Sequence, residues 1–233
     1  SFEPSGANII FGENARTIDR EILKNGSIID IAAAKILEEM GIDVNIASFK
    51  SISANNYLVN GDNYEYFCDE DEKTAINGDL KEIKLKKEVK LLSELHIQGK
   101  VYPHSYLYEN EQGERFFVLG FDAKESRYEH GTFRNYCRQR QIVKYHEWLT
   151  GKKLDAVCLG NPDLYMMVKK DENSLAVGLW NFFDDKIKKP VIEFADEYSS
   201  AEFINCSGKL EGNKVILDGP LYAYEFCFVH LKK

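Results

Sequence analysis

The residue types that most often act as nucleophile and base, cysteine and histidine, do not form a recognisable catalytic pair in this sequence. His130 lies in a polar stretch shortly before Cys137, so a thiol–imidazole pair can be imagined. Cys137, however, falls in the middle of a predicted helix, where a nucleophile is poorly presented. No cysteine has the glycines of a G-x-C-x-G elbow, and G-x-S-x-G, G-x-G-x-x-G and P-loop motifs are absent. We therefore predict no catalytic residue.

The acidic and sulfur-containing side chains also lack the spacing of a metal site. The cysteines form no C-x-x-C pair and have no histidines at zinc-ligand spacing; they are Cys68, Cys137, Cys158, Cys206 and Cys227. The acidic run at 69–72 lacks the spaced oxygen ligands and the glycine of an EF-hand loop. We expect reduced thiols, no metal and no cofactor. Carboxylates are plentiful, but the sequence does not identify two of them at the separation that a glycosidase needs.

Aromatic side chains are the remaining functional signal. Sugars stack on the faces of Trp and Tyr rings, so four aromatic residues of the C-terminal part could form a carbohydrate platform: Trp180, Tyr165, Tyr198 and Tyr222. Trp180 lies in the apolar strand pattern Leu175 to Asn181, where burial in the core is the alternative.

A basic, aromatic segment from residue 138 to 157 could bind nucleic acid or pack as a helix. Helical spacing aligns Phe133, Cys137, Gln141, Tyr145 and Trp148 in one semi-apolar stripe, with the basic side chains flanking it. The formal net charge of the 233-residue chain is −8 and its pI is about 5.3. We therefore predict a packing helix over 132–149, ending at Gly151, and no nucleic-acid partner.

No run approaches the roughly 20 apolar residues that span a bilayer, and no signal peptide is present. We predict no membrane association and a cytoplasmic location. The sequence begins at Ser1 without an initiator Met, which leaves open that the chain is a piece of a longer protein.

The first part of the chain shows an α/β pattern. Ala7 to Phe11 predicts a strand and residues 15–24 a short helix. Asp30 is a suitable N-cap for a helix over 31–40 that Gly41 ends. Residues 50–80 are polar and predict a largely irregular insertion with one strand at 64–68. Strands follow at 89–97, 105–108 and 115–121, the last two as a hairpin.

After Gly151 the pattern changes to short strands separated by turn residues. We predict strands at 154–159, 164–169, 174–182, 191–194, 200–205, 214–217 and 222–230. Seven such strands are typical of an antiparallel β-sandwich. The predicted domains are therefore 1–151 and 152–233.

Four stretches resemble the C-terminal, non-catalytic region of glycoside-hydrolase-like proteins of the β-galactosidase type: 23–41, 108–122, 138–154 and 175–185. In that order, they resemble a segment that enters a helix of the family's α/β domain, its Asn-Glu-x-Gly hairpin, its closing helix, and the first hairpin of its sandwich. The likeness covers most of the chain except residues 50–80. The resemblance implies a partial flavodoxin-like, class I amidotransferase-like trimerisation domain followed by a β-sandwich.

The family's TIM barrel, which holds its catalytic carboxylates, is absent from this sequence, so no catalytic residue is carried over. The resemblance implies an accessory module with a structural or oligomerisation role, a carbohydrate-active parent, an upstream barrel partner if the chain is a piece, and homo-oligomers. Two alternatives stay open: an independent carbohydrate-binding protein, and a small stand-alone amidotransferase-like enzyme with a reactive cysteine.

Overall fold

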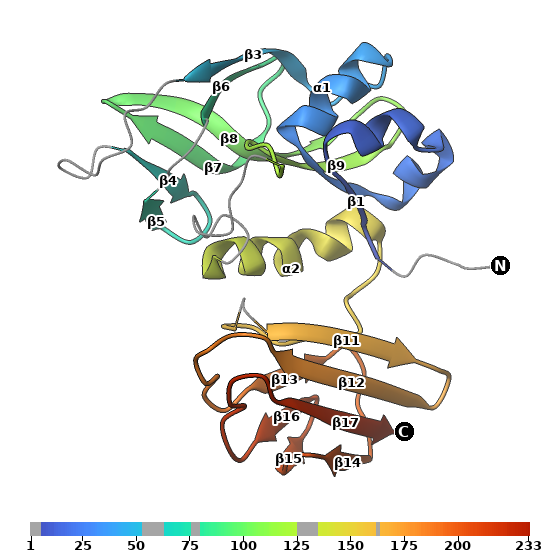
Figure 1. The fold of residues 1–233 in the computed structure, drawn as a ribbon. Coiled ribbons are helices and arrows are strands. Elements are labelled where there is room, and N and C mark those ends of the chain that lie inside the picture. Colours follow the sequence, from blue (N-terminus) through green and yellow to red (C-terminus); the bar gives the residue numbers. More distant parts are fainter. Residues whose placement is uncertain (1–5, 53–62, 76–79, 125–134, 162–163) are drawn as a thin grey trace. The chain divides into compact units, whose positions relative to one another are not determined.

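The chain forms two compact units in a computed structural model, which describes residues 6–52, 63–75, 80–124, 135–161 and 164–233 (Figure 1). The first unit comprises residues 1–132 and 145–152, and the second comprises residues 133–144 and 153–233. Helix α2 (Tyr136–Thr150) contributes its first part to the second unit and its end to the first. No helix in the described ranges is both long and apolar enough to cross a membrane.

The first unit is built on a mixed seven-stranded sheet in the order β1-β2-β9-β8-β7-β4-β5. Its parallel half consists of β1 (Asn8–Ile10), β2 (Ser27–Asp30) and β9 (Arg115–Leu119). Its antiparallel half consists of β8 (Lys100–Glu109), β7 (Lys90–Ile97), β4 (Asn63–Phe67) and β5 (Glu72–Ala75). A separate ribbon pairs β3 (Ile46–Ile52) with β6 (Leu80–Leu85). This unit is therefore rich in β-strands, with parallel pairing confined to β1, β2 and β9.

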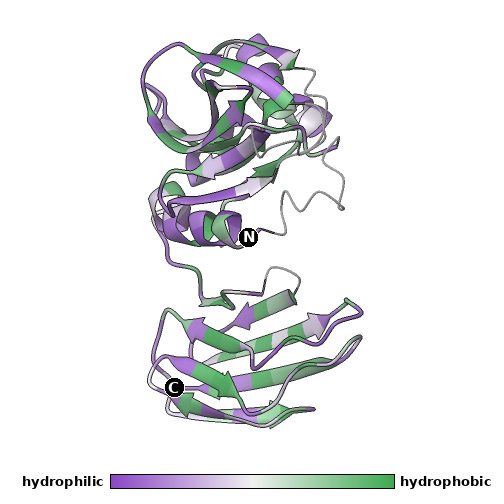
Figure 2. Ribbon diagram, turned by 90° about the vertical axis from the view of Figure 1, so that its left-hand side faces the viewer, coloured by the Kyte–Doolittle hydropathy of each residue, from purple (hydrophilic) through white to green (hydrophobic). Residues whose placement is uncertain are grey.

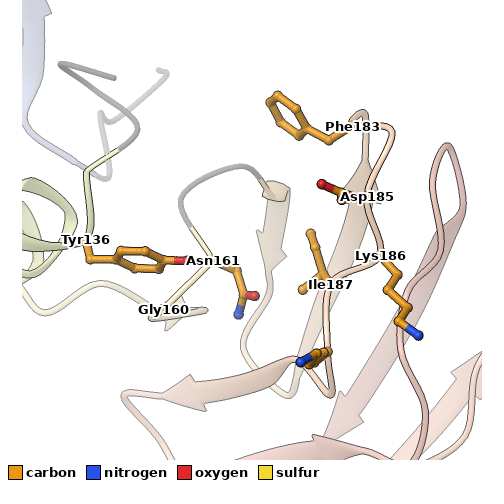
Figure 3. A pocket seen from close by; sticks show the side chains of 8 residues that line it. Tyr136, Gly160, Asn161, Phe183, Asp185, Lys186 and Ile187 are labelled. Atoms are coloured by element: carbon orange, nitrogen blue, oxygen red, sulfur yellow. The ribbon is translucent and has the colours of Figure 1, made fainter. Parts of the chain in front are cut away.

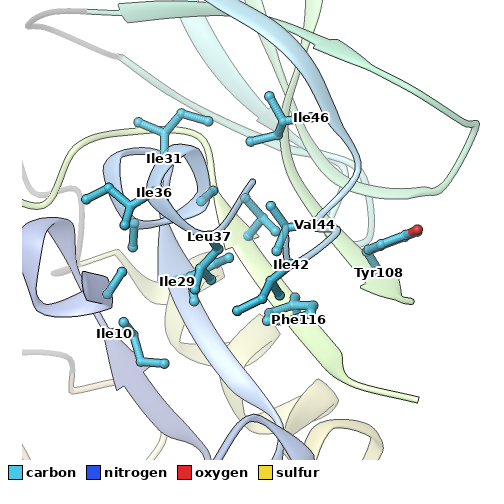
Figure 4. Close-up of a cluster of buried hydrophobic side chains, with 14 of the residues drawn as sticks. Ile10, Ile29, Ile31, Ile36, Leu37, Ile42, Val44, Ile46, Tyr108 and Phe116 are labelled. Atoms are coloured by element: carbon cyan, nitrogen blue, oxygen red, sulfur yellow. The ribbon is translucent and has the colours of Figure 1, made fainter. Parts of the chain in front are cut away.

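Helix α1 (Ile31–Glu39) covers the parallel half of this sheet and closes its core. Ile29 and Phe116 of the sheet, Leu37 of the helix, and Ile42 and Val44 of the following turn pack together (Figure 4). Asp30 caps α1 as predicted. Its buried carboxylate accepts hydrogen bonds from the backbone N–H groups of Ala33 (2.8 Å), Gly12 (2.9 Å) and Ala123 (3.0 Å). One side chain therefore ties three chain segments together.

The helix predicted at 15–24 is instead two 3₁₀ helices, Gly12–Thr17 and Arg20–Asn25. Ile18 is extended (φ −72°, ψ 145°), and the Asp19 carboxylate caps the second helix by accepting from Glu21 N–H. This cap starts a second helix, so the single helix that the residue pattern predicted is divided into two.

Helix α2 begins at Tyr136, later than the predicted residue 132, because the Asn135 side chain accepts hydrogen bonds from Cys137 N–H (2.8 Å) and Arg138 N–H (3.3 Å). The predicted packing stripe is buried at Cys137, Gln141 and Tyr145. Arg138, one of the basic side chains expected to flank this stripe, is fully buried, and its guanidinium donates to Gln141 Oε1.

The second unit contains two four-stranded sheets of a β-sandwich. One has the order β10-β13-β16-β15, formed by Ala156–Val157, Val191–Phe194, Lys214–Leu217 and Gly208–Glu211. The other has the order β11-β12-β17-β14, formed by Leu164–Lys170, Ser174–Asn181, Phe226–Lys232 and Ser200–Ile204. Hydrophobic residues recur along these strands (Figure 2). The sequence missed β15, because Leu210 is its one large apolar residue.

Candidate functional site

The outer face of the sheet β11-β12-β17-β14 carries a group of aromatic side chains. In β12, Leu175, Val177 and Leu179 are fully buried in the sandwich core, so strand alternation turns Gly178 and Trp180 to the opposite face. The strand register then aligns Trp180 with Tyr165 of β11 and with Phe226 of β17. Three aromatic residues from three strands therefore lie in one row across the sheet.

Five rings contact one another on this face, and we call them the aromatic cluster: Tyr165, Trp180, Phe182, Phe226 and Phe228. The centroid of the Trp180 ring lies 5.7 Å from Tyr165, 6.4 Å from Phe226 and 5.3 Å from Phe228. Phe182 lies 5.9 Å from Tyr165. These separations fall in the range of favourable aromatic pairs.

Gly178 makes room for the indole ring. A Cβ atom at this position would lie 2.6 Å from two ring carbons of Trp180 and 2.8 Å from Phe228. The indole therefore lies against the β12 backbone where any larger residue would displace it. In the next row of the same face, Met167 pairs with Gly178, Gly178 with Phe228, and Phe228 with Ile204.

Much of this surface is open to solvent. Tyr165 is 52% exposed, Phe182 59% and Phe226 43%, and the flanking Met167 and Ile204 are 43% and 56% exposed. Exposed apolar patches of this kind mark interaction sites. Beyond these two rows the same sheet carries charged side chains, including a Lys232–Glu202 ion pair at 2.6 Å.

The four sequence-predicted platform residues separate into three groups. Tyr165 and Trp180 are brought together in the cluster. Tyr222 is exposed (54%) and makes none of the cluster's ring contacts described above. Tyr198 is 8% exposed and packs edge-on against Phe194 in the sandwich core, so it is not available to a ligand.

Sequence reasoning missed Phe182, Phe226 and Phe228. The alternation of Phe226 and Phe228 with the buried Cys227 and Val229 was the signal that could have placed the two phenylalanines on the outer face.

A pocket of about 410 Å³ lies at one end of the second unit (Figure 3). Tyr136, from the start of α2, extends towards Asn161 from one side, while Phe183 and Asp185 lie on the other. Gly160, Lys186, Ile187 and Lys188 complete the lining. The Gln139 amide fixes one wall, since it donates to Cys158 O (2.9 Å) and accepts from Gly160 N–H (3.0 Å).

The opposite wall of this pocket is fixed by the buried Asn181. Its Nδ2 donates to the backbone carbonyls of Asp185 (2.7 Å), Leu221 (3.2 Å) and Tyr222 (3.1 Å), and its Oδ1 accepts from Phe183 N–H (3.1 Å). One side chain thus sets the course of the segment that follows β12.

The thiols are poorly suited to nucleophilic chemistry. Burial raises the pKa of Cys158 to about 11 and the pKa of Cys227 to about 12, so both are protonated at neutral pH. Cys137 is buried in α2, and His130 lies outside the described residues. Within the described ranges, no group of three or more His, Cys, Asp or Glu side chains could hold a metal ion.

A polar network in the first unit is structural. Asp43 accepts hydrogen bonds from Lys86 (2.8 Å) and from the Tyr108 hydroxyl. Burial alone would raise the pKa of Asp43, but these bonds outweigh it and lower the pKa to about 2. Burial and the Asp43 carboxylate raise the pKa of Tyr108. Glu38 accepts from the N–H groups of Val44 and Ile46 (3.0 Å each), so the network holds the turn after α1.

No protein-family model matches the chain, and no curated protein matches it. The similar solved structures include Gan42B, a GH42 β-galactosidase from G. stearothermophilus, with 11% identity and a TM-score of 0.46 over 97% of this chain. A β-galactosidase from Rahnella sp. R3 gives 9% and 0.46, and one from Bacillus circulans sp. alkalophilus gives 8% and 0.42. The chain spans 31% of the length of each. These neighbours are β-galactosidases, the type of protein that the sequence motifs resemble.

Proposed function

We propose that this chain is a non-catalytic accessory module of a carbohydrate-active protein, and that its β-sandwich binds glycans on the aromatic cluster. The observation that carries the proposal is the row Tyr165–Trp180–Phe226, which is exposed at both ends and aligned across three strands. The C–H groups on the face of a pyranose carry partial positive charge, which the negative face of an aromatic ring attracts. A row of rings offers successive sugar units the same contact.

The proposal includes the finer expectations from the sequence. The β1-β2-β9 strands with α1 are the part that an amidotransferase-like ancestor would leave, and the polar networks there suit a structural role. On the grounds of resemblance and composition, we also propose a domain boundary at 151/152, an upstream barrel as partner and a cytoplasmic location.

Glycan binding can be tested through Trp180 fluorescence. A Trp148→Phe background leaves Trp180 as the one tryptophan, since the chain has two. We expect a panel of soluble β-linked oligosaccharides and polysaccharides to shift its emission. Tyr165→Ala should weaken binding, because it removes a ring that contacts Trp180. Tyr224→Ala should not, because this more exposed ring (68%) bonds Asp184 outside the cluster. No response to the whole panel, or equal binding by Tyr165→Ala, would contradict the proposal.

A second function, docking of another protein surface or a second copy, is favoured by a different observation. Met167 and Ile204 extend the exposed face with aliphatic side chains, which do not stack on sugars. If this is the main role, the molecular mass of Ile204→Lys in solution, measured by light scattering, should differ from that of the wild-type protein. The substitution should leave the mass unchanged if the face binds glycans alone.

A further inference from the structure

The pocket beside the aromatic cluster has the composition of a site for a single sugar ring. The chain runs from the cluster into the pocket within a few residues: Trp180 and Phe182 belong to the cluster, and Phe183 and Asp185 line the pocket. We propose that this pocket binds one neutral pyranose unit, such as the end of a glycan whose other units lie on the cluster. This inference rests on the proposed function.

The polar groups of the pocket suit hydroxyl recognition. The Asp185 carboxylate faces the pocket from one side, with the Asn161 amide and the Tyr136 hydroxyl opposite (Figure 3). A carboxylate accepts hydrogen bonds from two neighbouring hydroxyls, while an amide both donates and accepts. Together they match the vicinal hydroxyls of a sugar.

The placement of Asp185 suits a ligand that donates hydrogen bonds and carries no negative charge of its own. Asp185 repels an anion, and the Lys186 side chain points away from Asp185 and Asn161 (Figure 3). Lys186 and Lys188 are exposed and can offer donors at the rim. An ammonium group accepts no hydrogen bond, so Asp185 is the charged acceptor among the lining residues.

The apolar groups and the size of the pocket agree with the polar groups. Tyr136 is 52% exposed, and Phe183 and Ile187 add apolar surface to the lining. The volume of about 410 Å³ lies within the range of small-molecule sites, which is about 300–1,000 Å³.

The walls of the pocket are preorganised. The Asn181 and Gln139 amides hold the two sides, as described above, and Ile187 and Leu221 exchange two backbone hydrogen bonds of 2.9 Å. Fixing the walls before binding lowers the entropy cost of forming the complex.

The test uses methyl α- and β-glycosides of galactose, glucose and mannose as probes, with saturation-transfer NMR and titration on the full chain. We expect at least one probe to bind, and Asp185→Asn to weaken it roughly tenfold or more, since hydrogen bonds to charged groups are the strong ones. The matched control is Asp184→Asn, which makes the same charge change at the neighbouring exposed residue, outside the pocket lining. It should bind like the wild type. Both substitutions change exposed side chains, so both variants should fold.

Trp180→Ala separates this inference from the proposed function. If the pocket binds the monosaccharide, Trp180→Ala should lose oligosaccharide binding and keep monosaccharide binding. If no probe binds, or if Asp185→Asn and Asp184→Asn bind equally, the pocket proposal is overturned while glycan binding by the cluster can still stand. If the glycosides bind but Trp180→Ala leaves the affinity for every oligosaccharide unchanged, the cluster proposal fails and the pocket proposal stands.

Discussion

The space above Gly178 gives the sharpest test of how the aromatic cluster is built. In Gly178→Ala, the new methyl group would lie 2.6 Å from Trp180 and 2.8 Å from Phe228, whereas ordinary contact begins at 3.4 Å. The two rings would therefore have to retreat by about 0.8 Å and about 0.6 Å. Overpacking of this kind costs about 1–3 kcal/mol. Replacing glycine in a strand returns about 0.5–1 kcal/mol, so we expect a net loss of about 1–2 kcal/mol.

The loss of stability can be measured by urea unfolding followed by circular dichroism. The matched control is Gly219→Ala, because a Cβ atom there meets nothing within 4 Å and the φ angle is not positive. We expect this control to change stability by no more than about 0.5 kcal/mol. In the cluster, the Trp180 emission of Gly178→Ala should also shift towards that of a solvated indole, measured in the Trp148→Phe background.

A double-mutant cycle identifies the clashing partner. If the indole is the main obstacle, Gly178→Ala should lose at least half of its cost in a Trp180→Ala background, with the remainder due to Phe228. Coupling between contacting residues is commonly about 0.5–3 kcal/mol. An unchanged cost in that background would refute the reasoning, because the methyl group would then be clashing with something other than the indole.

Three further predictions concern the first unit. Gly26→Ala should cost more than about 4 kcal/mol, because its Cβ would lie 2.2 Å from the backbone oxygen of Leu149; Gly41→Ala, with a similar φ of +79° but open space, should cost about 1–2 kcal/mol. Urea unfolding of the two variants compares their losses of stability directly. Equal losses would show that backbone strain at the positive φ, and not the clash with Leu149, determines the cost. Asp30→Ala should cost more than about 3 kcal/mol, since it leaves three backbone N–H groups without their acceptor; a small loss in the same assay would mean that water replaces the carboxylate. The pKa of Asp43, about 2, lies below its usual 3.8, so the stability it contributes is present above about pH 4 and lost as the pH falls towards 2. Tyr108→Phe removes one hydrogen bond to Asp43, should raise this pKa, and should start acid unfolding at a higher pH by circular dichroism; an unchanged acid profile would contradict the linkage.

The sequence predicted those helices and strands whose ends or buried faces are determined by residues close together in the chain. Asp30 and Gly41 set the ends of α1 through a cap and a positive φ, and the alternation of Leu175, Val177 and Leu179 identified β12. The bulge after Leu91 could not be foreseen. Leu91 and Leu95 are four residues apart, so strand alternation alone would place them on one face, but it is Leu92 that is fully buried together with Leu95.

The candidate site was predicted only in part, because its members come together through strand pairing. Tyr165 and Trp180 were expected as sugar contacts, but their alignment with Phe226 depends on the β12–β17 register, which no local pattern contains. Tyr198 was predicted as a sugar contact because it is aromatic, but its side chain is buried in the sandwich core. The pocket joins Tyr136 to Asp185, and no local motif relates residues so far apart in the chain.

The parallel pairing of β2 with β9 affects how the chain can be synthesised. Ser27 pairs with Phe116, so β2 and the capped start of α1 leave the ribosome long before their partner strand exists. The wait extends further, because Gly26 packs against Leu149 at the end of α2. By contrast, β11 pairs with β12 across a short turn. During synthesis from the N-terminus, the first unit therefore stays incomplete until after residue 149. Ile28 and Ile29, which are buried in the folded unit, lack their neighbours until then, and such transiently exposed apolar segments are where aggregation begins and chaperones bind.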